Sequence, residues 1–190
     1  HRSLSWLKKA ETFTDDVDSS FIFYWISFNA AYSGVQTRTE FHTEATLFGV
    51  FFEKLIAADN NGQIYNLIWR RFSQEVKGIL TNKYIYNGFW NEFLSTDGND
   101  WEVSFEKSKR LVNIALAKED CHKILSILFS RIYVLRNQIF HGNASWNSAL
   151  NRQQIKDCTT LLAHLVPLFL MIMMSFPDEQ WGQINYPVQQ

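Results

Sequence analysis

The stretch Phe-Ile-Phe-Tyr-Trp-Ile-Ser-Phe-Asn-Ala-Ala-Tyr, residues 21–32, says most about how this chain folds. It is apolar on most sides of a helix, and its polar exceptions are Asn29 and Tyr32. A helix that is apolar all round is buried on all sides, so we expect this one at the centre of a helical bundle. Asp18 and Ser19 precede it and are the expected N-caps. We expect Asn29 and Tyr32 to be buried hydrogen-bond partners, and weaker candidates for substrate binding.

The composition also indicates an all-helical protein. The 190 residues include sixteen Phe and seven Trp but only three Pro and eight Gly, which favours long continuous elements over turns. This length fits a single domain over residues 1–190 with a sizeable core. The formal net charge of −1 excludes a bulk cationic field, so any contact with nucleic acid must be local.

Apolar residues at helical spacing predict helices along most of the chain. Between the N-terminus and residue 94, the expected helices cover residues 3–13, 21–32, a stretch from Thr39 or Thr43 to about 59, 63–80, and the end of the aromatic segment 84–94. After a loop at 95–100, further helices are expected at 105–118, about 120–140 and about 151–176. We therefore predict an all-α fold, an irregular up-and-down bundle with a long helix at 120–140 and a final apolar helix.

The final apolar run, residues 161–176, contains His164 and Pro167 and falls short of the roughly 20 residues that span a bilayer. We expect a core or interface helix, bent at Pro167, and no membrane partner. Three methionines in this run are more often core residues than a binding surface; they are Met171, Met173 and Met174. At a two-fold interface they would also suit a dimer, because Met side chains adapt their shape.

The chain offers no sequence signature of a metal or cofactor site. Cys121 and Cys158 have no CxxC or Cys/His spacing, which favours free thiols in a reduced, cytoplasmic compartment. There is no HExxH motif and no paired-carboxylate signature. We therefore expect neither a metal nor a cofactor.

The segment Arg-Asn-Gln-Ile-Phe-His-Gly, residues 136–142, offers most of the chemistry. An arginine can clamp a phosphate with its planar guanidinium, and a histidine can move a proton near neutral pH. On a regular helix Arg136 and His141 diverge by roughly 140°. They would meet only if the helix ended near Phe140, with Gly142 as a left-handed C-cap, or if each met its counterpart from a second subunit. Asn137 shares a face with His141 and could orient it or bind a phosphate oxygen.

A structural interpretation competes with phosphate binding by the motif. Arg136 and His141 are also the residues expected at a helix C-terminus, where cations bond the last carbonyls and interact favourably with the helix macrodipole. Arg131 lies on the margin of the apolar stripe of the same helix, and would supply either a second phosphate contact or a salt bridge to Asp or Glu. We favour the salt bridge.

The motif Arg136-Asn137-x-x-x-His141 resembles the signature of the HEPN family (higher eukaryotes and prokaryotes nucleotide-binding). In that signature four to six positions separate an Arg from a His, and the residue directly after the Arg is usually polar. The aromatic helix at residues 25–32 is similar to the early helix of Apea-like HEPN proteins. This resemblance implies a helical homodimer in which two Arg/His pairs form one cleft. It also implies metal-independent RNA cleavage. In the implied reaction His141 acts as acid or base, Arg136 stabilises the charge of the phosphorane, and Asn137 positions the phosphate or His141.

The same resemblance implies a cellular setting and a competing role. HEPN proteins act in phage defence or as toxins, which suggests an antitoxin or a fused domain as a partner. Other members bind without cleaving, so the alternative is a catalytically inactive module that binds RNA, nucleotides or proteins. A purely structural dimerisation domain is the third hypothesis.

Overall fold

The computed structural model describes residues 1–32, 43–94, 100–142, 145–149, 151–179 and 181. Within these residues the secondary structure is helical and includes no strand, which confirms the all-α class. Thr39 and residues 95–99 of the predicted loop lie outside the described residues.

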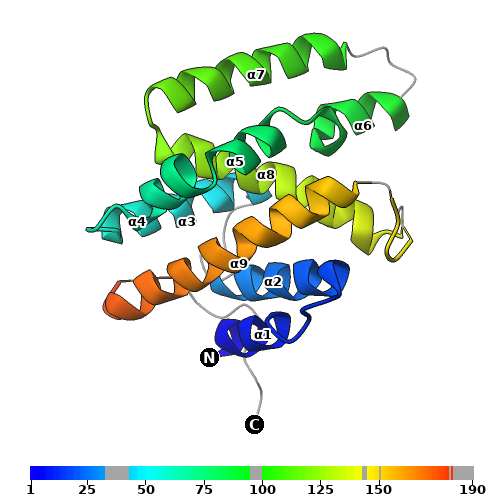
Figure 1. The fold of residues 1–190 in the computed structure, drawn as a ribbon. Coiled ribbons are helices and arrows are strands. Elements are labelled where there is room, and N and C mark those ends of the chain that lie inside the picture. Colours follow the sequence, from blue (N-terminus) through cyan, green and yellow to red (C-terminus); the bar gives the residue numbers. More distant parts are fainter. Residues whose placement is uncertain (33–42, 95–99, 143–144, 150, 180, 182–190) are drawn as a thin grey trace.

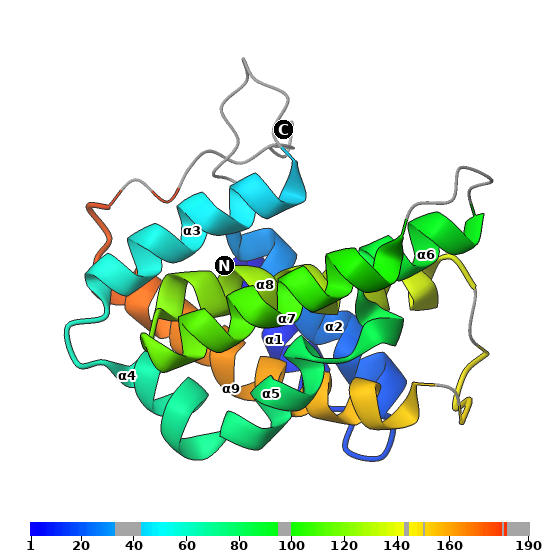
Figure 2. The same cartoon turned by 90° about the horizontal axis from the view of Figure 1, so that it is seen from above.

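The helices are stacked in layers around three central ones, α2, α8 and α9 (Figure 1). In chain order the elements are α1 (Arg2–Ala10), α2 (Val17–Tyr32), α3 (Glu44–Ala58), α4 (Gln63–Tyr65), the π-helix η2 (Asn66–Arg71), α5 (Ser73–Leu80), the 3₁₀ helix η3 (Lys83–Ile85), α6 (Asn87–Leu94), α7 (Trp101–Ala117), α8 (Cys121–Phe140) and α9 (Arg152–Ser175). α1 packs on α2, α2 on α9, and α3 on α8. α7 forms the outer layer over α8 (Figure 2).

The core is built around the ring of Phe28, in the stretch that the sequence places at the centre. Phe28 is fully buried, and its ring centroid lies 4.3 Å from that of Phe129 on α8 and 6.3 Å from that of Phe169 on α9. Three rings of α3 surround the same side chain, those of Phe48, Phe51 and Phe52. One aromatic cluster therefore joins four helices, and the prediction of a central helix at residues 21–32 is confirmed.

α2 begins earlier than the sequence predicts. The helix starts at Val17, and the carboxylate of Asp16 accepts hydrogen bonds from the Ser19 N–H (3.0 Å) and the Ser19 hydroxyl (2.6 Å). Asp16 is therefore the N-cap, and the predicted caps Asp18 and Ser19 lie inside the first turn. The prediction was wrong because Asp18 is occupied by a tertiary contact instead, described below.

The predicted helix at 63–80 is interrupted. Residues 66–71 form a π-helix, and the N–H of Phe72 donates to the carbonyl of Leu67, five residues earlier, at 2.9 Å. Phe72 itself has φ −123° and ψ 30°, outside the helical region. Its ring is buried, and the ring centroid lies 4.7 Å from that of His164 on α9. Burial of this ring against α9 thus outweighs the continuity of the helix.

α9 contains the predicted apolar face, which is buried along its length at Ile155, Cys158, Leu161, Leu162, Leu165, Leu168 and Phe169. The helix continues through Pro167, and the bend expected there stays a prediction. By length and composition α9 would also pass for a membrane span, contrary to the shorter run seen in the sequence, but half of that apolar window is buried in the fold. Core helices of soluble proteins meet the same criterion.

Candidate functional site

The motif lies at the C-terminal end of α8, next to the start of α9 (Figure 1). The helix ends at Phe140, and the N–H of His141 still donates to the carbonyl of Asn137 at 3.0 Å. Gly142 follows with φ +70°, and its N–H donates to the carbonyl of Ile139 at 3.1 Å. The predicted helix end with a left-handed glycine is confirmed, because this backbone conformation costs glycine little.

Arg136 is held in place by its own helix. Its guanidinium carbon lies 4.2 Å from the ring centroid of Phe140, one turn on, and its Nη1 donates to Asn137 Oδ1 at 2.8 Å. Its Nε is buried and has no hydrogen-bond partner among the described residues. The guanidinium is therefore oriented, half-buried, and short of one acceptor.

His141 is exposed and makes no hydrogen bond to a described side chain. Around the helix axis, at about 100° per residue, Asn137 lies between Arg136 and His141. The hydrogen bond from Arg136 to Asn137 turns the guanidinium toward the histidine side of the helix. Within one chain the structure thus brings Arg136 and Asn137 together, and His141 follows at the end of the helix without a hydrogen bond to either side chain.

Arg131 does not join this group. Its side chain is buried, its guanidinium carbon lies 4.4 Å from the ring centroid of Tyr86, and its Nη2 donates to the hydroxyl of Ser108 at 2.8 Å. Burial lowers the pKa of Arg131 from its usual value to about 10. The favoured salt bridge is not formed, because aromatic rings and a hydroxyl enclose the guanidinium and no described carboxylate reaches it. The phosphate contact stays a prediction.

Asn29 and Tyr32 lie at the other end of the bundle. Asn29 is eleven residues, or roughly 17 Å, along α2 from Asp18, whose carboxylate contacts the start of α9. Asn29 is exposed, which corrects the expectation of a buried hydrogen-bond partner, because it occupies the solvent side of α2. Tyr32 is buried as expected, its ring 4.8 Å from Phe28 and 5.0 Å from Phe48. Neither lies beside the motif.

A glutamine within the motif, which the sequence did not single out, ties it to the rest of the fold. Gln138 is buried, its Nε2 donates to the carbonyl of Tyr84 at 2.8 Å, and its Oε1 accepts from Asn151 Nδ2 at 2.8 Å. These bonds fix the end of α8 against η3 on one side and against the start of α9 on the other. In the sequence Gln138 is marked only by its place between Arg136 and His141. That place does not predict its hydrogen-bond partners, which lie 54 and 13 residues away along the chain.

The loop after the motif is fastened to the start of α2, a feature that sequence reasoning missed. The Trp146 indole N–H donates to both carboxylate oxygens of Asp16 at 3.3 Å, while Asp18 accepts from the Asn147 N–H at 3.0 Å and from Arg152 Nη1 at 2.9 Å. Hydrogen bonds from Ser19, and then from Trp146, hold the pKa of Asp16 below its usual value. Trp146 remains 73% exposed. A tryptophan in a polar loop was the available signal.

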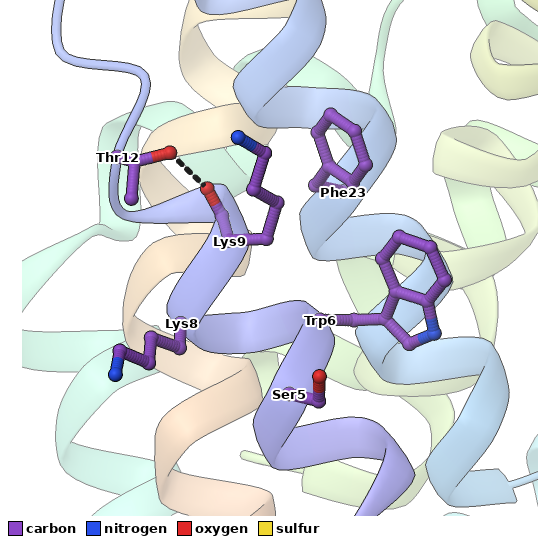
Figure 3. A pocket seen from close by; sticks show the side chains of 6 residues that line it. All are labelled: Ser5, Trp6, Lys8, Lys9, Thr12 and Phe23. Atoms are coloured by element: carbon purple, nitrogen blue, oxygen red, sulfur yellow. Dashed lines mark hydrogen bonds between the residues drawn. The ribbon is translucent and has the colours of Figure 1, made fainter.

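A pocket on the α1 side of the bundle has basic and aromatic walls but does not gather them. Figure 3 shows Lys8 and Trp6 pointing to opposite sides of α1, with Lys9 beside Phe23. The rings of Trp6 and Phe13 both stack on the ring of Phe23, with centroid distances of 5.6 Å and 5.1 Å. Lys9 Nζ lies 4.7 Å from the ring centroid of Phe13. These contacts attach α1 to α2, and we assign them a structural role.

Comparisons of the chain with protein-family models, with curated proteins and with solved structures gave no match. Among the described residues, no group of three or more His, Cys, Asp or Glu side chains could hold a metal ion. The function must therefore be argued from the side chains at the end of α8 and the loop that follows it.

Proposed function

We propose that this chain is an HEPN-like RNA-binding domain that cleaves RNA without a metal, using Arg136, Asn137 and His141 of two paired copies. The observation that carries the proposal is the state of Arg136. Its guanidinium is oriented by Phe140 and Asn137 and has no carboxylate partner among the described residues, at the helix end that presents an exposed histidine. A phosphate would bind the free face of this guanidinium through charge-assisted hydrogen bonds.

The proposed reaction is an internal transesterification. The His141 imidazole takes the proton of the ribose 2′-hydroxyl, and the 2′-oxygen attacks the phosphorus. The 5′-oxygen of the next nucleotide leaves with a proton from the imidazolium of the second copy. Arg136 stabilises the negative charge of the phosphorane, and the products are a 2′,3′-cyclic phosphate and a 5′-hydroxyl.

The geometry of one helix supports the proposed pairing of two copies. Arg136 and His141 are not bonded to each other, so a second α8 end would complete each site. Exposed aromatic side chains next to the motif fit such a contact or an RNA base: Phe140 is 44% exposed and Tyr84 is 47% exposed. Pairing through the exposed Met171 and Met174 would not serve, because Met171 lies roughly 29 Å along α9 from Arg152.

The test is cleavage of mixed single-stranded RNA in EDTA by the purified protein. Wild type should yield fragments ending in 2′,3′-cyclic phosphate, and His141→Ala and Arg136→Ala should each lose at least roughly a hundredfold in rate. His122→Ala is the matched control, because His122 is also exposed and lies at the other end of α8. No cleavage by wild type, or undiminished cleavage by His141→Ala, rejects the nuclease. RNA binding without cleavage that depends on Arg136 would replace it with the binding module.

The remaining parts of the proposal come from the resemblance alone. In this proposal the domain acts in the cytoplasm, in phage defence or as a toxin, and an antitoxin or fused domain restrains it. Light scattering on the isolated protein tests the pairing. A dimer whose mass falls to that of one chain in Phe140→Asp is the expected result, and a monomeric wild type at assay concentration would exclude the composite cleft.

A further inference from the structure

The loop that follows His141 closes one side of a second pocket. The pocket measures about 460 Å³ and lies between the start of α2, this loop and the start of α9. Its walls include Asp15, Asp16, Trp146, Arg152 and Lys156. This volume is within the range of small-ligand sites, roughly 300–1,000 Å³.

Hydrogen bonds hold the pocket wall at Trp146. The indole N–H is held by both oxygens of Asp16, which is itself fixed as the N-cap of α2. The next residue, Asn147, is bonded through its N–H to Asp18, and Arg152 Nε donates to the carbonyl of Ser148 at 3.0 Å. An aromatic ring that is 73% exposed and bonded through its edge leaves its face available for stacking.

The charges that remain unused define the ligand. Asp16 and Asp18 are engaged as described, whereas Asp15 and Lys156 are exposed and make no hydrogen bond or ion pair with a described residue. Arg152 is engaged as well, by the carboxylate of Asp18 and by the carbonyl of Ser148. The pocket therefore offers one stacking face, one free carboxylate and one free ammonium. A cationic ligand would leave the Lys156 ammonium without a partner, whereas a nucleotide offers a base to the ring and the carboxylate and a phosphate to the ammonium.

Among the four bases, guanine fits the carboxylate. Its N1–H and its N2 amino group are adjacent donors that match the two oxygens of one carboxylate. Adenine and cytosine place a ring acceptor beside their amino group, and uracil has a single N–H between two carbonyls. We propose that the pocket of Trp146, Asp15 and Lys156 binds a guanine nucleotide of single-stranded RNA, with the base stacked on Trp146 and its phosphate on the Lys156 ammonium. This subsite rests on the proposed function, since it selects a base for the site at Arg136.

Binding of guanosine 5′-monophosphate, compared with adenosine 5′-monophosphate, tests the subsite by calorimetry on the whole protein. The guanine nucleotide should bind at least about tenfold tighter, Trp146→Ala should weaken it by about tenfold, and Asp15→Asn should remove the preference. Trp6→Ala is the matched control and should have no effect, because Trp6 is a half-exposed tryptophan in the pocket on α1.

Equal affinity for the two nucleotides, no binding, or binding unchanged by Trp146→Ala would overturn the subsite. This result is separate from the cleavage assay. RNA cleavage without nucleotide binding in the pocket would remove only the subsite, whereas guanine binding that depends on Trp146 without cleavage would leave the subsite and reject the nuclease.

Discussion

Three arginines of α8 and α9 each bury one guanidinium nitrogen that has no partner among the described residues, yet their surroundings assign them different roles. Arg131 lies between aromatic rings, and Arg152 is paired with Asp18 at 2.9 Å. Arg136 is half-buried, has no described carboxylate partner, and rests on an exposed ring. Of the three, Arg136 is thus the one best placed to bind an external phosphate at the motif.

Cys121 gives a pH-dependent prediction at the same scale. Burial, and then the charges of Asp59, Asp120 and Glu119, raise the pKa of its thiol from 9.0 to about 11. The folded protein therefore keeps this proton between pH about 9 and about 11 while the unfolded chain loses it, so stability contributed here falls as pH rises through that window.

We expect iodoacetamide to alkylate Cys121 in the folded protein far more slowly at pH 8 than in the urea-unfolded chain, because only the thiolate reacts. The rate should rise toward pH about 11. Mass spectrometry measures it, and Cys121→Ser identifies the site, since the other thiol, Cys158, is fully buried. Equal rates in folded and unfolded protein at pH 8 would contradict the raised pKa.

At the scale of elements, Arg131 attaches the outer layer to α8. Its guanidinium contacts Tyr86, just before α6, and Phe105 on α7, and it donates to Ser108 on α7. The Tyr86 hydroxyl in turn donates to Ser104 on α7 at 2.9 Å. A buried cation shared between two rings is therefore the polar link between these helices.

Arg131→Ala should loosen α7 before the rest of the fold. Loss of the ring contacts and the hydrogen bond should cost about 2 kcal/mol. In hydrogen exchange the amides of α7 should exchange faster, while those of α2 and α9 keep their protection. The control Arg110→Ala replaces an exposed arginine of α7 and should leave the exchange pattern unchanged. A uniform rise over all helices would show that Arg131 supports the whole core instead.

For the whole molecule, the aromatic cluster around Phe28 decides stability because it joins α2, α3, α8 and α9. Phe28→Ala should lower the free energy of unfolding by about 3–5 kcal/mol, since it leaves a cavity among rings that cannot collapse freely. Phe28→Leu should cost less. Urea unfolding followed by circular dichroism measures both, and a loss below about 1 kcal/mol for Phe28→Ala would show that the cluster repacks.

The sequence by itself determined the helical class, the buried stripes of α8 and α9, and the end of α8 at Phe140, before Gly142. Each depends on the period of the helix or on neighbours within one turn, so local spacing is sufficient. The hydrogen bond from Arg136 to Asn137 does not follow from such spacing, because adjacent residues point about 100° apart on a helix.

Only the tertiary structure decided the rest. Asp18 meets Arg152 across 134 positions of sequence, Trp146 meets Asp16 across 130, and Arg131 is enclosed by rings of other elements. No local pattern distinguishes these side chains from solvent-exposed ones, because their partners are set by how the helices pack. The same packing moved the cap of α2 from Asp18 to Asp16, and it holds the Trp146 indole on the carboxylate of Asp16.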